Sequence, residues 1–131
     1  MKCLLDTHII LRLAENSPKL SSAIKDIILD EANTKYVSIA SCWEVAIKLS
    51  LNKLDLVGGT SEFYRIIYEN GFELLHVSKE HLIVLETLPF HHRDPFDRLL
   101  IATATADGLV LLTDDEQIVA YAGEKLSLIL K

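Results

Sequence analysis

The sequence contains few cysteines, no long apolar run and no excess of basic residues, and each absence excludes a class of protein. Its 131 residues include two cysteines, Cys3 and Cys42. Both lie in apolar segments, so we expect buried free thiols rather than a disulfide framework. No apolar run reaches the roughly 18 residues of a membrane-spanning helix. The N-terminus MKCLLDTHII is a poor match to a signal peptide, so we expect a cytoplasmic protein that does not associate with membranes.

The charge balance is acidic, with 13 Lys and Arg against 19 Asp and Glu and a formal net charge of −6. This excludes a general nucleic-acid binder that works through a basic surface. A nuclease stays compatible with the composition, because bound divalent cations can offset clustered carboxylates. A basic partner protein is compatible as well.

The chain shows no repeat, low-complexity run or linker, and its length fits one domain over residues 1–131. Short apolar runs alternate with longer patterns of helical period. This alternation predicts an α/β fold whose parallel sheet is covered by helices on both faces. The patterns predict strands over 2–6, 36–40, 72–77, 109–113 and 125–130, and helices over 7–15, 20–33, 41–51, 61–71, 78–88, 94–108 and 114–123.

Acidic residues occur where these predicted elements meet. Asp6 ends the first strand, and Asp114 and Asp115 follow the strand 109–113. Glu44 and Asp97 fall in the predicted first turns of two helices. In a parallel α/β sheet the carboxyl ends of the strands and the amino ends of the crossover helices share one edge. We therefore expect these acids to converge at that edge.

Each acid also has a local explanation. Asp6 can cap the helix that follows it. The segment 94–97 has an N-cap residue, a proline at the first helical position and an acid in the first turn. The segments 41–44 and 113–116 match capping boxes. Convergence of four carboxylates, however, would produce mutual repulsion and proton uptake. A hard divalent cation removes the repulsion, and oxygen ligands suit Mg²⁺ or Mn²⁺.

Four segments, in this order, resemble the signature segments of PIN domains. They are LLDTH at 4–8, SIASCWEVAIK at 38–48, HHRDPFDRLLIATA at 91–104 and LLTDDEQIVAY at 111–121. The similarity is greatest to the ribonuclease toxins of VapBC-type toxin–antitoxin pairs and covers nearly the whole chain. It implies a three-layer α/β/α sandwich with a central parallel sheet. It also implies a Mg²⁺- or Mn²⁺-dependent endoribonuclease that cleaves RNA, a cognate antitoxin and a homodimer.

The resemblance places the acidic quartet, as catalytic and metal-binding residues, on Asp6, Glu44, Asp97 and Asp115. Asp115 is preferred to Asp114 because the family pattern has Thr, any residue, then Asp. Asp6 and Asp97 are the expected direct ligands, while the number of metals, one or two, stays open. Residues expected to orient or support the carboxylates are Thr7, Thr113 and Asp94.

Three basic residues near the acids are candidates for contact with RNA: Arg93, Arg98 and Lys48. For both arginines the alternative is an ion pair with a nearby acid. Lys48 follows Glu44 at the i, i+4 spacing of a helix salt bridge, which competes with a phosphate contact.

Two further groups of residues have a structural explanation. His91 and His92 lack a cysteine or third histidine at ligand spacing, so we expect them to flank the site near RNA and not to bind zinc. The aromatic residues Trp43, Phe90 and Phe96 could stack on bases, but we expect them to pack in the core.

The alternative function is a non-catalytic PIN-like interaction domain that keeps an acidic edge, and retention of the whole quartet argues against it. A receiver domain needs paired acids after its first strand and a late lysine, but Asp6 stands alone and Lys131 comes too late. A haloacid-dehalogenase-type phosphatase needs Asp-x-Asp, where this chain has Asp6-Thr7-His8.

Overall fold

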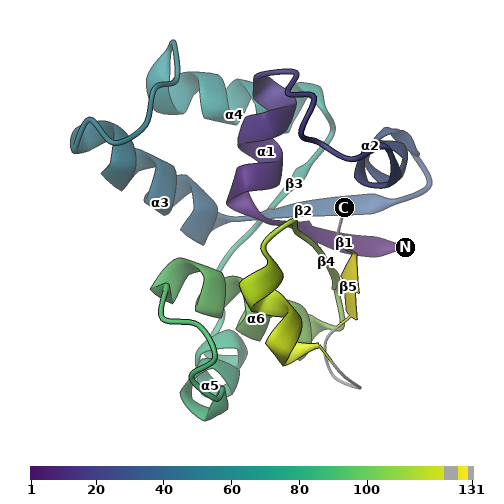
Figure 1. The fold of residues 1–131 in the computed structure, drawn as a ribbon, viewed down its shortest axis with the longest axis vertical. Coiled ribbons are helices and arrows are strands. Elements are labelled where there is room, and N and C mark those ends of the chain that lie inside the picture. Colours follow the sequence, from purple (N-terminus) through teal and green to yellow (C-terminus); the bar gives the residue numbers. More distant parts are fainter. Residues whose placement is uncertain (123–126, 130–131) are drawn as a thin grey trace.

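A parallel sheet of five strands forms the centre of the molecule in a computed structural model that describes residues 1–122 and 127–129. The strand order is β3-β2-β1-β4-β5, and every neighbouring pair is parallel. Figure 1 shows β1 near the middle of the sheet. The strands are β1 (Lys2–Leu5), β2 (Thr34–Ser38), β3 (Glu73–Leu75), β4 (Val110–Leu112) and β5 (Ser127–Ile129).

Six α-helices and one 3₁₀ helix are present in the described residues. They are α1 (Thr7–Ala14), α2 (Ser22–Leu29), α3 (Ile39–Ser50), α4 (Gly59–Glu69), α5 (Lys79–Thr87), α6 (Pro95–Asp107) and the 3₁₀ helix η1 (Glu116–Tyr121). None of the helices in this part of the chain has the length and apolar content needed to cross a bilayer.

Two apolar cores lie on opposite faces of the sheet. Alternate residues of β1 point to opposite faces, and Cys3 and Leu5 accordingly pack with apolar residues of α1, α2, α3 and α4. Leu4 packs instead with residues of α6 and η1. Figure 1 shows α1 to α4 separated from α5 and α6 by the sheet. The predicted three-layer α/β/α sandwich is confirmed, and so are the two buried free cysteines.

Helix α6 shows how local sequence positions a functional residue. Asp94 caps the helix by accepting hydrogen bonds from the backbone N–H groups of Phe96 and Asp97, and Pro95 occupies the first helical position. The helix ends at Gly108, whose φ of 65° is left-handed. The predicted start and stop are confirmed, and Asp97 therefore lies in the first turn.

Two of the predicted helix starts that differ from the structure concern the acidic residues. Helix α3 begins at Ile39 with Ser38 as its N-cap, two residues before the predicted start. Glu44 therefore lies in the second turn, and 41–44 is not a capping box. The segment after β4 forms a 3₁₀ helix capped by Asp115, not an α-helix capped by Thr113. The predicted strand 125–130 corresponds to β5, and its residues 125, 126 and 130 lie outside the described residues, as does Gly123 of the predicted helix 114–123.

Candidate metal-binding active site

The ends of two neighbouring strands bring Asp6 and Thr113 together. Asp6 follows β1, Thr113 follows β4, and β1 pairs with β4. The Thr113 hydroxyl donates to Asp6 Oδ2 at 2.6 Å, and its oxygen accepts the backbone N–H of Asp115 at 3.1 Å. This threonine thus links two acids that are more than 100 positions apart in the chain. It also holds the Asp6 carboxylate by this hydrogen bond.

Asp6 is buried, and it also caps helix α1 by accepting the backbone N–H of His8 at 3.4 Å. Burial acts to raise the pKa of Asp6, but the contacts with His8 and Thr113 outweigh it and hold that pKa below its usual value. Asp6 is therefore held as a carboxylate, and its role as a cap and its place in the cluster are compatible.

Asp97 projects from the first turn of α6 beside Asp6 and His92. Its Oδ2 lies 2.7 Å from His92 Nε2, and the same nitrogen lies 3.5 Å from Asp115 Oδ2. Burial and the negative charge of Asp6 raise the pKa of Asp97 to about 6, against a smaller opposing effect of His92. The protein without metal therefore carries the repulsion expected of converging carboxylates.

Asp115 and Asp114 differ in their surroundings. One ligand atom each of His92, Asp97 and Asp115 lies within 4.8 Å of the others. Asp114 is not part of this group and pairs with Arg12 of helix α1, in a hollow that it lines together with Asp115. This geometry favours Asp115 over Asp114 as the fourth acid.

Glu44 contributes a carboxylate from α3 that is 1% exposed. Its Oε2 accepts from Lys48 Nζ at 2.7 Å, whereas its Oε1 is buried without a hydrogen-bond partner. The negative charges of Asp94 and Asp97 also contribute to raising the pKa of Lys48. The Glu44–Lys48 pair is therefore near the acids of α6. A buried oxygen without a partner is costly, and a divalent cation would satisfy it. Asp97 and Asp115 thus group their carboxylates, Asp6 acts on Asp97 by its charge, and Glu44 offers an oxygen without a partner, so these residues fit a hard cation.

Other predicted residues have different partners in the structure. The Thr7 hydroxyl donates to the hydroxyl of Ser41 at 2.8 Å and so does not orient a carboxylate directly. This buried contact joins the start of α1 to α3. Asp94 acts as the cap of α6, and Lys48 forms the predicted salt bridge while staying partly exposed.

Arg98 is not available for RNA as it stands, because it is 6% exposed. Its guanidinium donates to the carbonyl oxygens of Leu88 and Pro89 and to the Tyr121 hydroxyl, at 3.3, 2.8 and 3.1 Å. It also lies 4.0 Å from the centre of the Phe90 ring. Among the described residues Arg98 forms these contacts and no ion pair, so it holds the loop before α6. Arg93, in contrast, is exposed.

The expectation that the aromatic residues pack in the core is wrong for two of the three. Trp43 is 61% exposed and Phe90 is 82% exposed. The half-buried Phe96 meets the Trp43 ring edge to face, with centroids 5.2 Å apart. Trp43 and Phe96 precede Glu44 and Asp97 in sequence, so this aromatic pair lies beside the acidic cluster.

His92 is expected from the sequence to lie beside the site near RNA, but its contacts with Asp97 and Asp115 are not predicted. It lies in an irregular segment between α5 and α6, where no periodicity indicates which way a side chain points. The useful signal was its position five residues before Asp97, within the segment that resembles the family.

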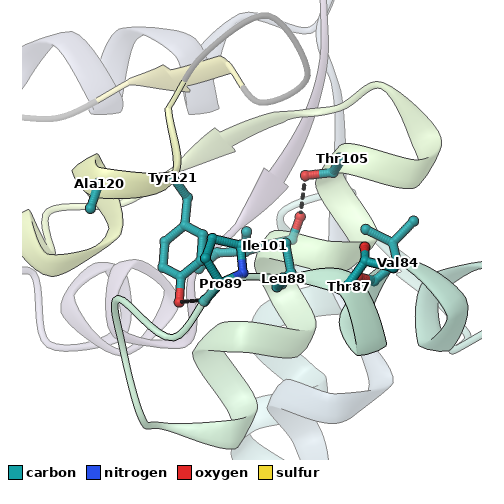
Figure 2. A pocket seen from close by; sticks show the side chains of 8 residues that line it. All are labelled: Val84, Thr87, Leu88, Pro89, Ile101, Thr105, Ala120 and Tyr121. Carbon is teal, nitrogen blue, oxygen red and sulfur yellow. Dashed lines mark hydrogen bonds between the residues drawn. The ribbon is translucent and has the colours of Figure 1, made fainter.

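Two hollows differ in their relation to this cluster. Figure 2 shows an apolar pocket of about 360 Å³ between the end of α5, α6 and η1, with Tyr121 on its wall. Its lining includes none of the clustered acids. A more open hollow of about 450 Å³ is lined by Asp115 together with His8 and Arg12. This second hollow therefore opens beside Asp115 and Asp114.

The comparisons with known proteins agree with this fold. The PIN domain family model matches residues 3–124, and the chain belongs to this family. No curated protein matches the sequence. The fold is similar to VapBC2 from Rickettsia felis bound to a DNA fragment from its promoter, with a TM-score of 0.76, 16% identity, and coverage of 100% of this chain and 99% of that chain.

Two other solved structures show the same fold. DNA-bound VapBC from Salmonella typhimurium matches with a TM-score of 0.71 at 15% identity, covering 98% of each chain. FitAcB from Neisseria gonorrhoeae matches with a TM-score of 0.62 at 18% identity, covering 98% of this chain and 96% of that chain. Helices on both sides of one parallel sheet are thus common to chains that share few identical residues.

Proposed function

We propose that this protein is a divalent-metal-dependent endoribonuclease and the toxin of a toxin–antitoxin pair. The observation that carries the proposal is the grouping of Asp97 with Asp115 and His92, together with the charge of the nearby Asp6 acting on Asp97. Glu44 Oε1 is buried without a partner and Asp97 has a raised pKa, so the cluster without metal is poorly compensated. Membership of the PIN family and likeness to solved toxin–antitoxin complexes support the same function.

The proposed reaction is hydrolysis of an RNA phosphodiester, in which a water oxygen bonds to phosphorus, a phosphorus–oxygen bond breaks and the leaving oxygen takes a proton. A bound Mg²⁺ or Mn²⁺ supplies Lewis-acid chemistry, offsetting phosphate charge and making water more acidic. Asp6 and Asp97 are the proposed direct ligands, and Glu44 completes the buried side of the site. Asp115 borders the open hollow, where its carboxylate can accept a hydrogen bond from the attacking water.

The basic groups available to a phosphate are few. Arg93 is exposed, and Lys48 lies at the mouth of the site with 36% of its side chain exposed. We propose that these two residues contact the RNA backbone, whereas Arg98 is committed to the loop before α6.

Cleavage of a structured RNA by the purified protein tests the proposal. We expect cleavage with Mg²⁺ or Mn²⁺, none with a chelator, and loss of cleavage and of growth arrest in Asp6→Asn and Asp97→Asn. Asp26→Asn, on the exposed face of α2, is the matched control and should behave as wild type. Cleavage that survives chelation and both site substitutions would show that another protein or another site is responsible.

Partners follow from the same proposal. A solved structure with this fold is a toxin–antitoxin complex from Klebsiella pneumoniae, so we propose a cognate antitoxin for this chain. A homodimer is proposed from the family resemblance of the sequence. Co-expression with the product of the adjacent reading frame, followed by co-purification and mass measurement in solution, checks both. If the two products do not co-purify and the chain is a monomer, these assignments fail.

A further inference from the structure

We propose that His92 is a positioning residue that fixes the orientation of the Asp97 carboxylate toward the metal. This inference rests on the proposed function of the same site. It goes beyond the acidic quartet, because it assigns a task to an imidazole side chain that approaches two of the four acids.

The position of the His92 ring proton follows from its two ring contacts. Nδ1 accepts the backbone N–H of Arg93 at 3.1 Å. A nitrogen that accepts carries no proton, so the proton of the neutral ring is on Nε2. Nε2–H then donates to Asp97 Oδ2 at 2.7 Å. The ring is therefore set as a donor to this carboxylate, which argues against His92 as a metal ligand through Nε2.

This hydrogen bond fixes one oxygen of Asp97 and leaves the other for a cation. The backbone of the same aspartate is fixed by the cap from Asp94. Carboxylates that bind metals are commonly held by such outer hydrogen bonds, which set their orientation and are nearly as sensitive to mutation as the ligands. Asp115 Oδ2, 3.5 Å from the same nitrogen, lies within reach of small movements of the ring.

The segment carrying His92 is itself held in place. The Tyr121 oxygen lies 3.0 Å from the backbone nitrogens of both His91 and His92, and its hydroxyl donates to Pro89 O at 2.7 Å. Figure 2 shows this Tyr121–Pro89 contact at the edge of the apolar pocket. Arg98 donates to the same tyrosine and to Pro89 O. The buried Arg98 and the half-buried Tyr121 thus brace the loop, and the loop presents the imidazole at 13% exposure.

Two substitutions separate donation from packing and from ligation. His92→Gln keeps an N–H donor near the position of Nε2, whereas His92→Met keeps a side chain of similar reach without the donor. His91→Met is the matched control, because the neighbouring ring packs edge to face on Tyr121 with centroids 5.0 Å apart.

The experiment measures Mg²⁺ and Mn²⁺ binding to the full chain by titration calorimetry, with folding checked by thermal melts in chelator. We expect His92→Met to lower the affinity for both ions by about tenfold or more, as is typical when a residue that hydrogen-bonds a metal ligand is replaced. We expect His92→Gln and His91→Met to stay within about threefold of wild type. If His92→Met does not fold, His92→Asn replaces it, because its shorter amide leaves the donor out of reach of Asp97.

Nitrogen NMR of the imidazole gives a second readout that packing alone would not change. We expect His92 to keep its proton on Nε2 when Mg²⁺ is added. Unchanged affinity in His92→Met overturns the proposal, and so does loss of the Nε2 proton on metal binding, which would make His92 a ligand. Wild-type protein that binds neither ion overturns the proposed function as well, whereas metal binding that does not depend on His92 overturns only this inference.

Discussion

Replacing Asp97 by asparagine should stabilise the metal-free protein at neutral pH, even though it should abolish cleavage. The folded protein raises the pKa of this carboxyl from 3.8 to about 6. A tenfold change in proton affinity corresponds to about 1.4 kcal/mol, so ionised Asp97 costs the fold up to about 3 kcal/mol. Solvent reaches the neighbouring Asp115, whose side chain is 28% exposed, and screening reduces the expected gain to about 1–2 kcal/mol.

The stability contributed by Asp97 depends on pH with a definite sign. Between pH 4 and 6 the folded protein holds a proton on Asp97 that the unfolded chain has released, so this group makes wild type less stable as pH rises. Asparagine does not titrate. The stability difference between Asp97→Asn and wild type should therefore be near zero below pH 4, grow through the window between 4 and 6, and reach its full value above pH 6.

Urea unfolding followed by circular dichroism, in chelator at pH 4, 5.5 and 7.5, measures this difference. Asp26→Asn makes the same chemical change on an exposed helix face and should show no such trend. Millimolar Mn²⁺ at pH 7.5 should stabilise wild type more than the variant, because a ligand stabilises only the state that binds it. If Asp97→Asn is less stable than wild type at pH 7.5 in chelator, or its advantage does not shrink on acidification, the electrostatic account of the site is refuted.

Two further substitutions test other contacts of the site. Lys48→Gln removes the partner of buried Glu44 and should lower stability in chelator by about 1 kcal/mol. Added Mn²⁺ should then recover more stability than in wild type, and equal recovery in thermal melts would contradict this. Arg98→Ala removes donors to two carbonyl oxygens and a hydroxyl and should cost about 2–4 kcal/mol. Arg98→Lys should recover little of this loss, since an ammonium lacks the planar fork. Chemical denaturation measures both Arg98 variants, and wild-type stability with impaired RNA binding would instead make Arg98 a nucleic-acid contact.

The sequence by itself determined the class of fold and the edge at which the acids meet. Short apolar runs and longer patterns of helical period predicted strands that alternate with helices. Parallel topology then places the strand ends and the helix starts at the same edge of the sheet. Asp6, Asp97 and Asp115 could be placed this way because each adjoins the end of an element. The boundaries of α6 were predictable for a similar reason, since Asp94, Pro95 and Gly108 act on the backbone next to them.

Only the tertiary structure decided which way the remaining side chains point. His92 and Arg98 belong to a braced loop, where contacts with Tyr121, far along the chain, fix their positions. Trp43 is exposed although it is aromatic. The packing of α3 against its neighbours decides which face of the helix is buried, and the type of residue at position 43 does not. Thr7 bonds to Ser41 and Thr113 to Asp6 across pairs of segments that only folding brings together. Local sequence controls where elements begin and end, whereas the direction of a side chain in an irregular or partly exposed segment depends on partners distant in the chain.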